Sequence, residues 1–119
     1  MNQETALEKA FAIVAIGGNA KGEAYEALTA AEEGRLDEAE EGLGRAERDL
    51  LEAHNIQTEF IQRAAAGEEV PLSMIFVHAQ DHLMCALEAQ SLISHMVGLT
   101  RRIDALERRV AELEEGSDE

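Results

Sequence analysis

The chain has 119 residues, only 3% of them aromatic, with one proline and no tryptophan. Its 25 acidic and 10 basic residues give a formal net charge of −15. This charge disfavours binding to nucleic acids or anionic membranes, because such binding requires cations that replace the counterions of phosphates. The single cysteine excludes an intrachain disulfide and a thiolate zinc cluster. No segment resembles a signal peptide or a membrane span, so we expect a cytoplasmic protein with no direct membrane insertion.

The first predicted helix covers residues 4–33, in a chain whose abundant Ala, Glu, Leu and Arg predict an all-α fold. Thr5 is its predicted N-cap. Three glycines, Gly17, Gly18 and Gly22, suggest close approach of a neighbouring backbone or room for a ligand. Steps of four and three residues predict a seam that faces the other helices. The residues of this seam are Leu7, Phe11, Val14, Gly18, Lys21, Tyr25 and Leu28.

The second predicted helix covers residues 37–66. Asp37 is its predicted N-cap, and Glu40 lies three residues further on, as in a capping box. His54 lies on or beside the apolar stripe, where a polar group needs a hydrogen bond or a place in a functional cleft. The predicted buried stripe is Ala39, Leu43, Ala46, Leu50, Ala53, Gln57, Phe60 and Ala64.

The third predicted helix covers residues 72–115, with Pro71 at its start and an acidic, frayed tail over residues 116–119. Its second half carries an apolar seam that repeats in steps of four and three, which is typical of a coiled coil. Traced backward, the seam passes on or beside His78 and His82. The seam residues are Leu92, Met96, Leu99, Ile103, Leu106, Val110 and Leu113, preceded by Ile75, Cys85 and Ala89.

Short connections predict antiparallel neighbours, and therefore an up-down-up three-helix bundle with a long third helix. That helix should project beyond the other two, because it is much longer than they are. We expect self-association to cover its exposed seam, in a trimeric, coiled-coil-like bundle. Cys85, Met74, Met84 and Met96 are expected to be core side chains.

His78, Asp81 and His82 lie at positions i, i+3 and i+4, so a helix brings them to one face. Three interpretations remain open. The histidines can be structural, each with a hydrogen-bond partner. They can bind a metal, since His-x-x-Asp-His partly matches the helical zinc motif His-x-x-Glu-His, with His54 or His95 as third ligand.

The third interpretation is nucleophilic catalysis by histidine. A neutral imidazole attacks phosphorus well at cellular pH, and its phosphoramidate can pass the phosphoryl group onward. The chain contains no Gly-x-x-x-x-Gly-Lys segment for ATP phosphates, which favours a phosphoryl carrier over a kinase.

Three segments of the chain carry a resemblance to a known family. They are VHAQDHLM at residues 77–84, LEAHNIQT at 51–58 continuing through FIQ at 60–62, and GRLDEAEE at 34–41. Gly18 and Ala20 add to it. Over about residues 5–99 the chain resembles the enzyme IIA component of the lactose/cellobiose (chitobiose) class of the bacterial sugar phosphotransferase system.

This resemblance implies a cytoplasmic homotrimer in which Nε2 of His78 accepts a phosphoryl group from HPr. The group then passes to a cysteine of the cognate IIB protein, which works with IIC in sugar uptake. Asp81, one per subunit, would meet its symmetry mates at the trimer axis and hold a divalent cation, with Mg²⁺ as the candidate. His82 would orient His78 or hydrogen-bond the phosphoryl group, and Gln57 and Gln80 would form a polar wall.

The chain departs from the family pattern at three places. Cys85 stands where the family usually has threonine, and residues 16–22 read IGGNAKG in place of an Asn-Ala-Gly-x-Ala-Arg-Ser-like string. The Arg-rich coiled coil from Thr100 onward passes the usual end of the family, and we interpret it as extra trimerisation length. The alternative function is a non-catalytic helical interaction module whose histidines and aspartate bind a metal.

Overall fold

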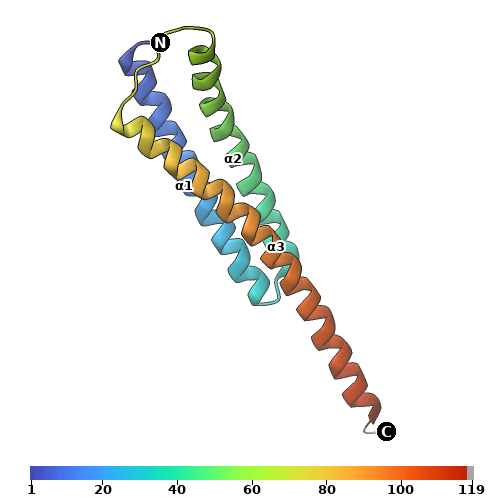
Figure 1. The fold of residues 1–119 in the computed structure, drawn as a ribbon. Coiled ribbons are helices and arrows are strands. Elements are labelled where there is room, and N and C mark those ends of the chain that lie inside the picture. The colour runs from blue at the N-terminus through green and yellow to red at the C-terminus, as the bar shows by residue number, and fades with distance from the viewer. Residues whose placement is uncertain (118–119) are drawn as a thin grey trace.

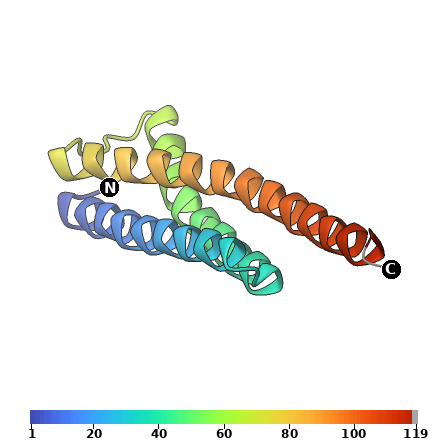
Figure 2. The same cartoon turned by 90° about the horizontal axis from the view of Figure 1, so that it is seen from below.

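The computed structural model describes residues 1–117 and contains three helices in an up-down-up arrangement (Figure 1). They are α1 (Gln3–Glu32), α2 (Leu36–Ala65) and α3 (Met74–Ser117). The molecule measures 76 × 21 × 19 Å, because α3 continues well past the other two helices (Figures 1 and 2). The predicted all-α fold is confirmed, and each predicted helix end lies within two residues of the observed one.

The predicted N-caps of the first two helices are wrong. The side chain of Asn2 accepts a hydrogen bond from the Thr5 amide at 2.8 Å, so Asn2 caps α1. Gly34, with φ of +84°, ends α1 in a left-handed conformation that glycine adopts without steric cost. Three residues, Glu33, Gly34 and Arg35, separate the two helices. Arg35 occupies the cap position of α2 without a capping side chain. Asp37 therefore lies inside the first turn, where its charge complements the helix dipole.

The start of α3 also differs from the prediction. The helix begins at Met74, and Pro71 lies in the preceding connection. The hydroxyl of Ser73 accepts a hydrogen bond from the amide of Phe76 at 3.1 Å, which is the geometry of a serine N-cap. At the other end, Gly116 and Ser117 are helical, so the predicted frayed tail is wrong for these two residues. Residues 118–119 lie outside the described part of the chain.

The buried face of α1 is one residue away from the predicted seam. Phe11 and Tyr25 of that seam are 58% and 52% exposed. Since α1 packs against both other helices, small side chains on its inner face allow all three backbones to approach closely. At one such contact, a Cβ atom on Gly42 of α2 would lie 3.2 Å from the Cβ atom of Ala27. The buried face consists of Ala6, Ala10, Ile13, Gly17, Ala20, Ala24, Ala27 and Ala31, with Ala30 beside it.

The predicted stripe of α2 is largely confirmed. Leu43 is only half-buried, and Gly42 takes its place facing α1. Ala64 is exposed, because it is the next-to-last residue of α2, where the chain turns away toward Gly67. The ring of Phe60 packs against that of Phe76 in α3, with centroids 4.6 Å apart. The buried residues are Ala39, Gly42, Ala46, Leu50, Ala53, Gln57 and Phe60.

The inner face of α3 lies one residue beyond the predicted seam. It consists of Ala79, Leu83, Ala86, Ile93 and Val97. The seam itself is exposed in the single chain, with Leu92 at 51% and Leu106 at 63%. The expectation of core positions for Cys85, Met74, Met84 and Met96 is wrong, since all four are exposed on faces of α3 that turn away from α1 and α2.

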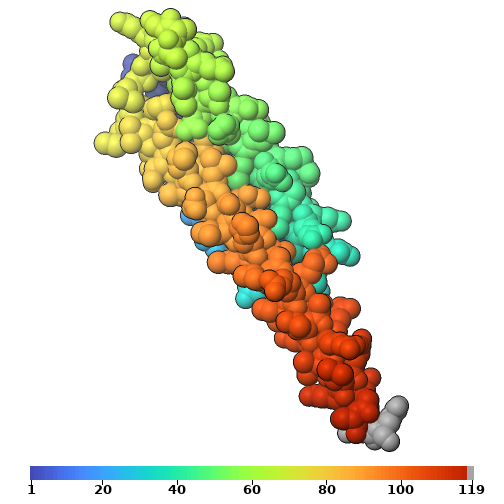
Figure 3. Space-filling view, turned by 45° about the vertical axis from the view of Figure 1, so that its right-hand side comes forward, coloured from blue at the N-terminus to red at the C-terminus, as the bar shows by residue number. Residues whose placement is uncertain are grey.

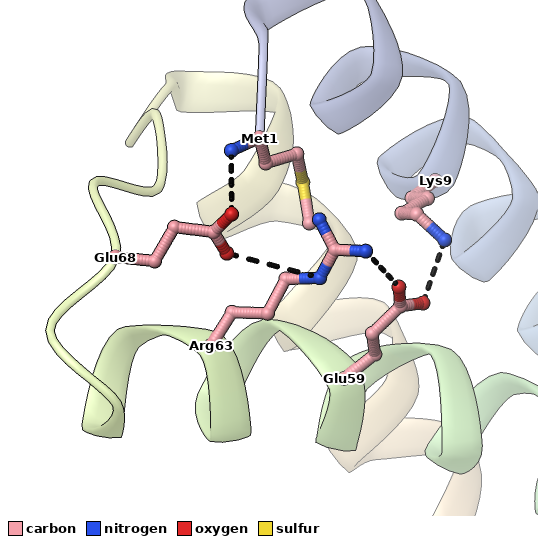
Figure 4. Close-up of polar contacts among 5 residues, drawn as sticks. All are labelled: Met1, Lys9, Glu59, Arg63 and Glu68. Atoms are coloured by element: carbon pink, nitrogen blue, oxygen red, sulfur yellow. Dashed lines mark hydrogen bonds and ion pairs between the residues drawn. The ribbon is translucent and has the colours of Figure 1, made fainter.

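Ion pairs join the N-terminus, α1, α2 and the α2–α3 connection at the end of the bundle where the chain begins (Figure 4). The amino group of Met1 contacts Glu68 at 3.1 Å, and Glu68 lies 3.8 Å from Arg63. Arg63 contacts Glu59 at 2.9 Å, and Lys9 donates a 2.6 Å hydrogen bond to Glu59. This hydrogen bond lowers the pKa of the Glu59 carboxyl. This series of ion pairs connects the N-terminus and the α2–α3 connection to α1 and α2.

Within residues 1–117, none of the helices combines the length and the apolar character needed to cross a membrane.

Candidate functional site

The two histidines of the predicted site lie together near the start of α3. Their ring centroids are 4.4 Å apart, and the rings meet edge to face at 65°. His78 is exposed and His82 is partly buried. Asp81, also exposed, lies three residues from His78 and one from His82 on the same helix. The structure therefore brings the two imidazoles into contact, as their i and i+4 spacing predicts.

The position of this pair follows from the packing of α3. Ala79 and Leu83 point into the bundle and are completely buried. His78 and His82 each precede one of these residues, so they lie at the edge of the buried face. Neither ring exchanges a hydrogen bond with another protein group in the described part of the chain. The structural interpretation, two half-buried histidines each satisfied by a partner, does not match this geometry.

Gln57 of α2 and Gln80 of α3 form a second polar feature, at the contact between these two helices. The amide nitrogen of Gln57 donates a short hydrogen bond to the side-chain oxygen of Gln80. Gln57 is only 7% exposed and is the one buried polar side chain among the described residues. Its bond to Gln80 satisfies a group whose burial would otherwise be costly. The amide nitrogen of Gln80, which is partly buried, stays available to another acceptor.

The zinc interpretation lacks a third ligand within one chain. No group of three His, Cys, Asp or Glu residues that could hold a metal occurs in residues 1–117. His54 on α2 and His95 on α3 are both exposed and do not complete a site with His78 and His82. Asp81 accepts a 3.8 Å contact from the thiol of Cys85, its neighbour one turn further along. A shared cation at Asp81 would need carboxylates from several copies of the chain.

Sequence reasoning missed this contact between Asp81 and Cys85. The i and i+4 spacing of the two residues was the available signal. The contact was overlooked because Cys85 was expected in the core.

Neither His78 nor His82 lines any of the main surface hollows of residues 1–117. An apolar hollow of about 300 Å³ lies nearby, between the end of α2 and the start of α3, and neither imidazole lines it. Its lining is Phe60, Ile61, Ala64, Val70, Pro71, Leu72, Phe76 and Gln80. The ring of His78 is exposed to solvent and that of His82 is partly exposed, so a large partner can reach the pair from outside the bundle. Fold and site together define a helical-bundle protein with two contacting histidines at the edge of its third helix.

Comparison with known proteins gives the family. Residues 8–101 match the model of the family described as "PTS system, Lactose/Cellobiose specific IIA subunit". The galactose-specific EIIA component of Lactococcus lactis subsp. cremoris (strain MG1363) is 44% identical over 97 residues, which cover 82% of this chain and 84% of that protein. The chain belongs to this family of phosphotransferase components, which carry phosphoryl groups in sugar transport.

Solved structures agree with this assignment. The cellobiose-specific enzyme IIA of Bacillus anthracis superimposes with a TM-score of 0.81 at 37% identity, covering 88% of this chain and 94% of that one. The IIA(chitobiose) structure, solved in complex with HPr from Escherichia coli, gives a TM-score of 0.73 at 30% identity, covering 83% and 96%. The predicted family and bundle are thereby confirmed.

Proposed function

We propose that His78 is the residue that carries the phosphoryl group. In this proposal Nε2 of His78 receives it from phospho-HPr and passes it to the cysteine of a cognate IIB protein, which acts with IIC in the uptake of a lactose/cellobiose/chitobiose-type sugar. The observation that carries the proposal is the exposed position of His78, in ring contact with a second histidine. A phosphohistidine donor and a IIB thiol both belong to proteins, so the acceptor must be open to large partners.

The chemistry needs only groups that this site and its partners supply. The neutral ring of His78, with its proton on Nδ1, attacks phosphorus through Nε2. The new N–P bond forms as the N–P bond of phospho-HPr breaks and the HPr imidazole leaves. In the second step the IIB thiolate forms an S–P bond and the His78–phosphorus bond breaks. His82 holds the His78 ring by its edge-to-face contact and donates a hydrogen bond to the phosphoryl oxygens.

The HPr partnership is supported by a structural neighbour, the IIA(chitobiose) protein solved in complex with HPr. The proposal names a class of sugar and no individual compound. The matched proteins are named for galactose, cellobiose and chitobiose, although their sequences and folds are all similar to this chain. In this scheme the IIA protein binds other proteins and never the sugar, so selectivity belongs to IIB and IIC. Gln80 is a candidate for the polar wall of the phosphoryl site, and Gln57 supports it through their hydrogen bond.

We further propose a homotrimer in which Asp81 of each subunit meets its equivalents around the symmetry axis. Three converging carboxylates repel one another strongly unless a cation lies between them. A divalent cation with a preference for oxygen ligands, such as Mg²⁺, would fill this structural role. The exposure of Asp81 on the same face as the apolar seam of α3 supports this arrangement.

Phosphoryl transfer from HPr tests the function directly. The protein is incubated with phosphoenolpyruvate, enzyme I and HPr, and its intact mass is then measured. We expect one acid-labile phosphoryl group on the wild type and none on His78→Ala. His95→Ala is the matched control, since His95 is another exposed histidine of α3, and it should accept the group normally.

Two results would contradict the proposal. Failure of the wild type to gain mass with a competent HPr would favour the metal-binding interaction module instead. Full phosphorylation of His78→Ala would move the acceptor to another residue. Asp81→Leu separates the two roles of the α3 face: it should change metal content or assembly and still accept the phosphoryl group. Loss of phosphorylation in an Asp81→Leu variant with unchanged assembly would show that this division of roles is wrong.

A further inference from the structure

Within residues 1–117, the last third of α3 extends past the bundle, and its side chains are almost all exposed. Arg101 forms an ion pair with Glu40 of α2 at 2.8 Å, near the end of the bundle. From there α3 continues through Ser117, about 24 Å at 1.5 Å per residue. Figures 1 and 2 show this segment projecting away from α1 and α2, and Figure 3 shows it as a narrow extension of the surface. The match to the family also ends at residue 101, so the projection is an addition to the shared bundle.

This projection carries a regular apolar stripe. In the heptad notation, Ile103 and Val110 occupy a positions, while Leu99, Leu106 and Leu113 occupy d positions. All five are between 53% and 63% exposed in the single chain. The stripe continues the exposed residues Leu92 and Met96, which lie alongside the bundle. Such a continuous stripe of large side chains on an otherwise charged helix is the signature of a coiled-coil interface.

The charges beside the stripe indicate which partner fits it. Arg102 and Arg109 occupy g positions, and Glu107 and Glu114 occupy e positions. In a parallel coiled coil, a g residue of one helix lies beside the e residue of the next heptad in the other, five positions further on. Arg102 would therefore face Glu107, and Arg109 would face Glu114, in a second copy of this chain. An antiparallel pair would place arginine beside arginine and glutamate beside glutamate.

The ion pairs within the helix leave these groups open for such contacts. Across residues 1–117, Arg102, Glu107 and Glu114 form no ion pair. Arg109 lies 3.4 Å from Glu112, and both side chains are about two-thirds exposed. The outward-facing Arg108 differs, because it is paired with Asp104 one turn earlier at 3.1 Å.

We propose that residues 99–117 form a parallel, in-register coiled coil with other copies of this chain, oriented by the Arg102–Glu107 and Arg109–Glu114 pairs between copies. The proposal rests on the homotrimer proposed above and extends it past the residues that the family model matches; it does not depend on the phosphoryl-transfer chemistry. β-Branched residues at a with leucine at d favour two strands in a parallel coiled coil of their own. This segment continues directly from the part of α3 that packs in the bundle, so its strand number must follow the number of bundles that associate. The segment therefore sets direction and register, and the bundle sets the number of copies. A parallel register also brings His78 and Asp81 of every copy to the same height along the assembly.

A charge swap in the full-length protein tests the proposal. The double variants Arg102→Glu/Arg109→Glu and Glu107→Arg/Glu114→Arg each place like charges between parallel copies. We expect the dissociation constant of the assembly, measured by sedimentation equilibrium, to rise about 10-fold or more in each, from the loss of two exposed pairs. The fourfold combination should return it to within about threefold of the wild-type value. Arg108→Glu, the outward-facing control, should leave it nearly unchanged.

Cross-linking tests the orientation independently. In a Cys85→Ser background, Val110→Cys should form disulfide-linked copies on mild oxidation, because equivalent a positions meet in a parallel register. Arg108→Cys, on the outer face, should not. A monomeric wild type, a fourfold variant no better than the double variants, or the absence of a cross-link in the Val110→Cys variant would overturn the proposal. These readouts report assembly alone, so a failure here is distinguishable from a failure of phosphoryl transfer.

Discussion

The two faces of α3 differ although their residues are neighbours in the sequence. Ala79 and Leu83 are completely buried against the bundle, whereas His78 is exposed and His82 only partly covered. Further along, Ile93 and Val97 are buried, and Leu92 and Met96 are about half exposed. One face therefore stabilises the single chain. The other, shifted by one residue, carries the candidate chemistry together with the larger apolar side chains.

The same contrast extends to the whole bundle. The core is built mainly from alanine, with Ile13, Leu83 and Phe60 as its largest fully buried side chains. Small residues bury little apolar area, so this core contributes modest stability for the length of its helices. Leucine, isoleucine and methionine on α3 remain available to contacts between chains. This division is what the proposed association between chains requires, since the larger apolar side chains of α3 are left outside the core of the single chain.

The largest expected effect on stability comes from the buried face of α3. Leu83→Ala should lower the free energy of unfolding by about 2–5 kcal/mol, because it leaves a cavity beneath α1. Leu106→Ala, on the exposed stripe, should instead lower the midpoint of denaturant unfolding by an amount that depends on protein concentration. The loss should be full where the wild type is associated and should vanish where both proteins are monomeric, because the substitution weakens a contact between chains. Denaturant unfolding at several concentrations measures both. Equal, concentration-independent losses in the two variants would contradict the distinction between the faces.

A smaller effect is expected at the polar contact between α2 and α3. Gln57→Ala leaves Gln80 without its donor and should lower the free energy of unfolding by about 1–3 kcal/mol. Gln62→Ala serves as the control, since Gln62 is an exposed glutamine of the same helix. Chemical denaturation followed by circular dichroism provides the measurement. A loss no larger than that of the control would show that the buried pair contributes nothing to the packing of α3.

The smallest effect is expected at Glu23 of α1. The hydrogen bond with Asp49, burial and the charge of Asp49 raise the pKa of Glu23, while Arg45 acts against this. The folded chain therefore holds the proton more tightly, and stability is lost as the pH rises through the ordinary value of 4.5 and the raised pKa above it. Glu23→Gln should remove this loss and raise stability at pH 7 by less than about 1 kcal/mol.

Thermal unfolding at pH 4 and pH 7 checks this expectation. Glu8→Gln is the control, because it removes one negative charge from an exposed position of α1. If Glu23→Gln and Glu8→Gln shifted the pH dependence equally, net charge alone would explain the effect.

Much of the fold could be predicted because its signals are local. Helix-forming composition and the repeats in α2 and α3 gave three helices and their order. The inner face of α1 was misplaced by one residue because alanines occur on several of its sides and the larger residues Phe11 and Tyr25 lie outside. The predicted helix starts at Thr5 and Pro71 were wrong for a similar reason. Asn2 and Ser73, which cap α1 and α3 in the structure, lie within three residues of them and are equally suitable cap residues by type.

The candidate site was predictable only in part. The contact between His78 and His82 follows directly from their spacing on a helix. Their exposure depends on which face of α3 meets α1, and that choice involves residues distant in the sequence. Cys85 was expected in the core for the same reason. The roles of Asp81 and the exposed stripe concern contacts between chains, which a periodic pattern indicates without defining the number of copies.

The identity of the phosphorylated atom tests the central claim most directly. The protein, labelled with ¹⁵N and phosphorylated through enzyme I and HPr, is studied by two-dimensional ¹H–¹⁵N NMR of its histidine rings at alkaline pH. The account predicts that a phosphorus coupling appears on Nε2 of His78, while the rings of His54 and His95 keep their shifts. A coupling on any other histidine, or on Nδ1 of His78, would contradict it.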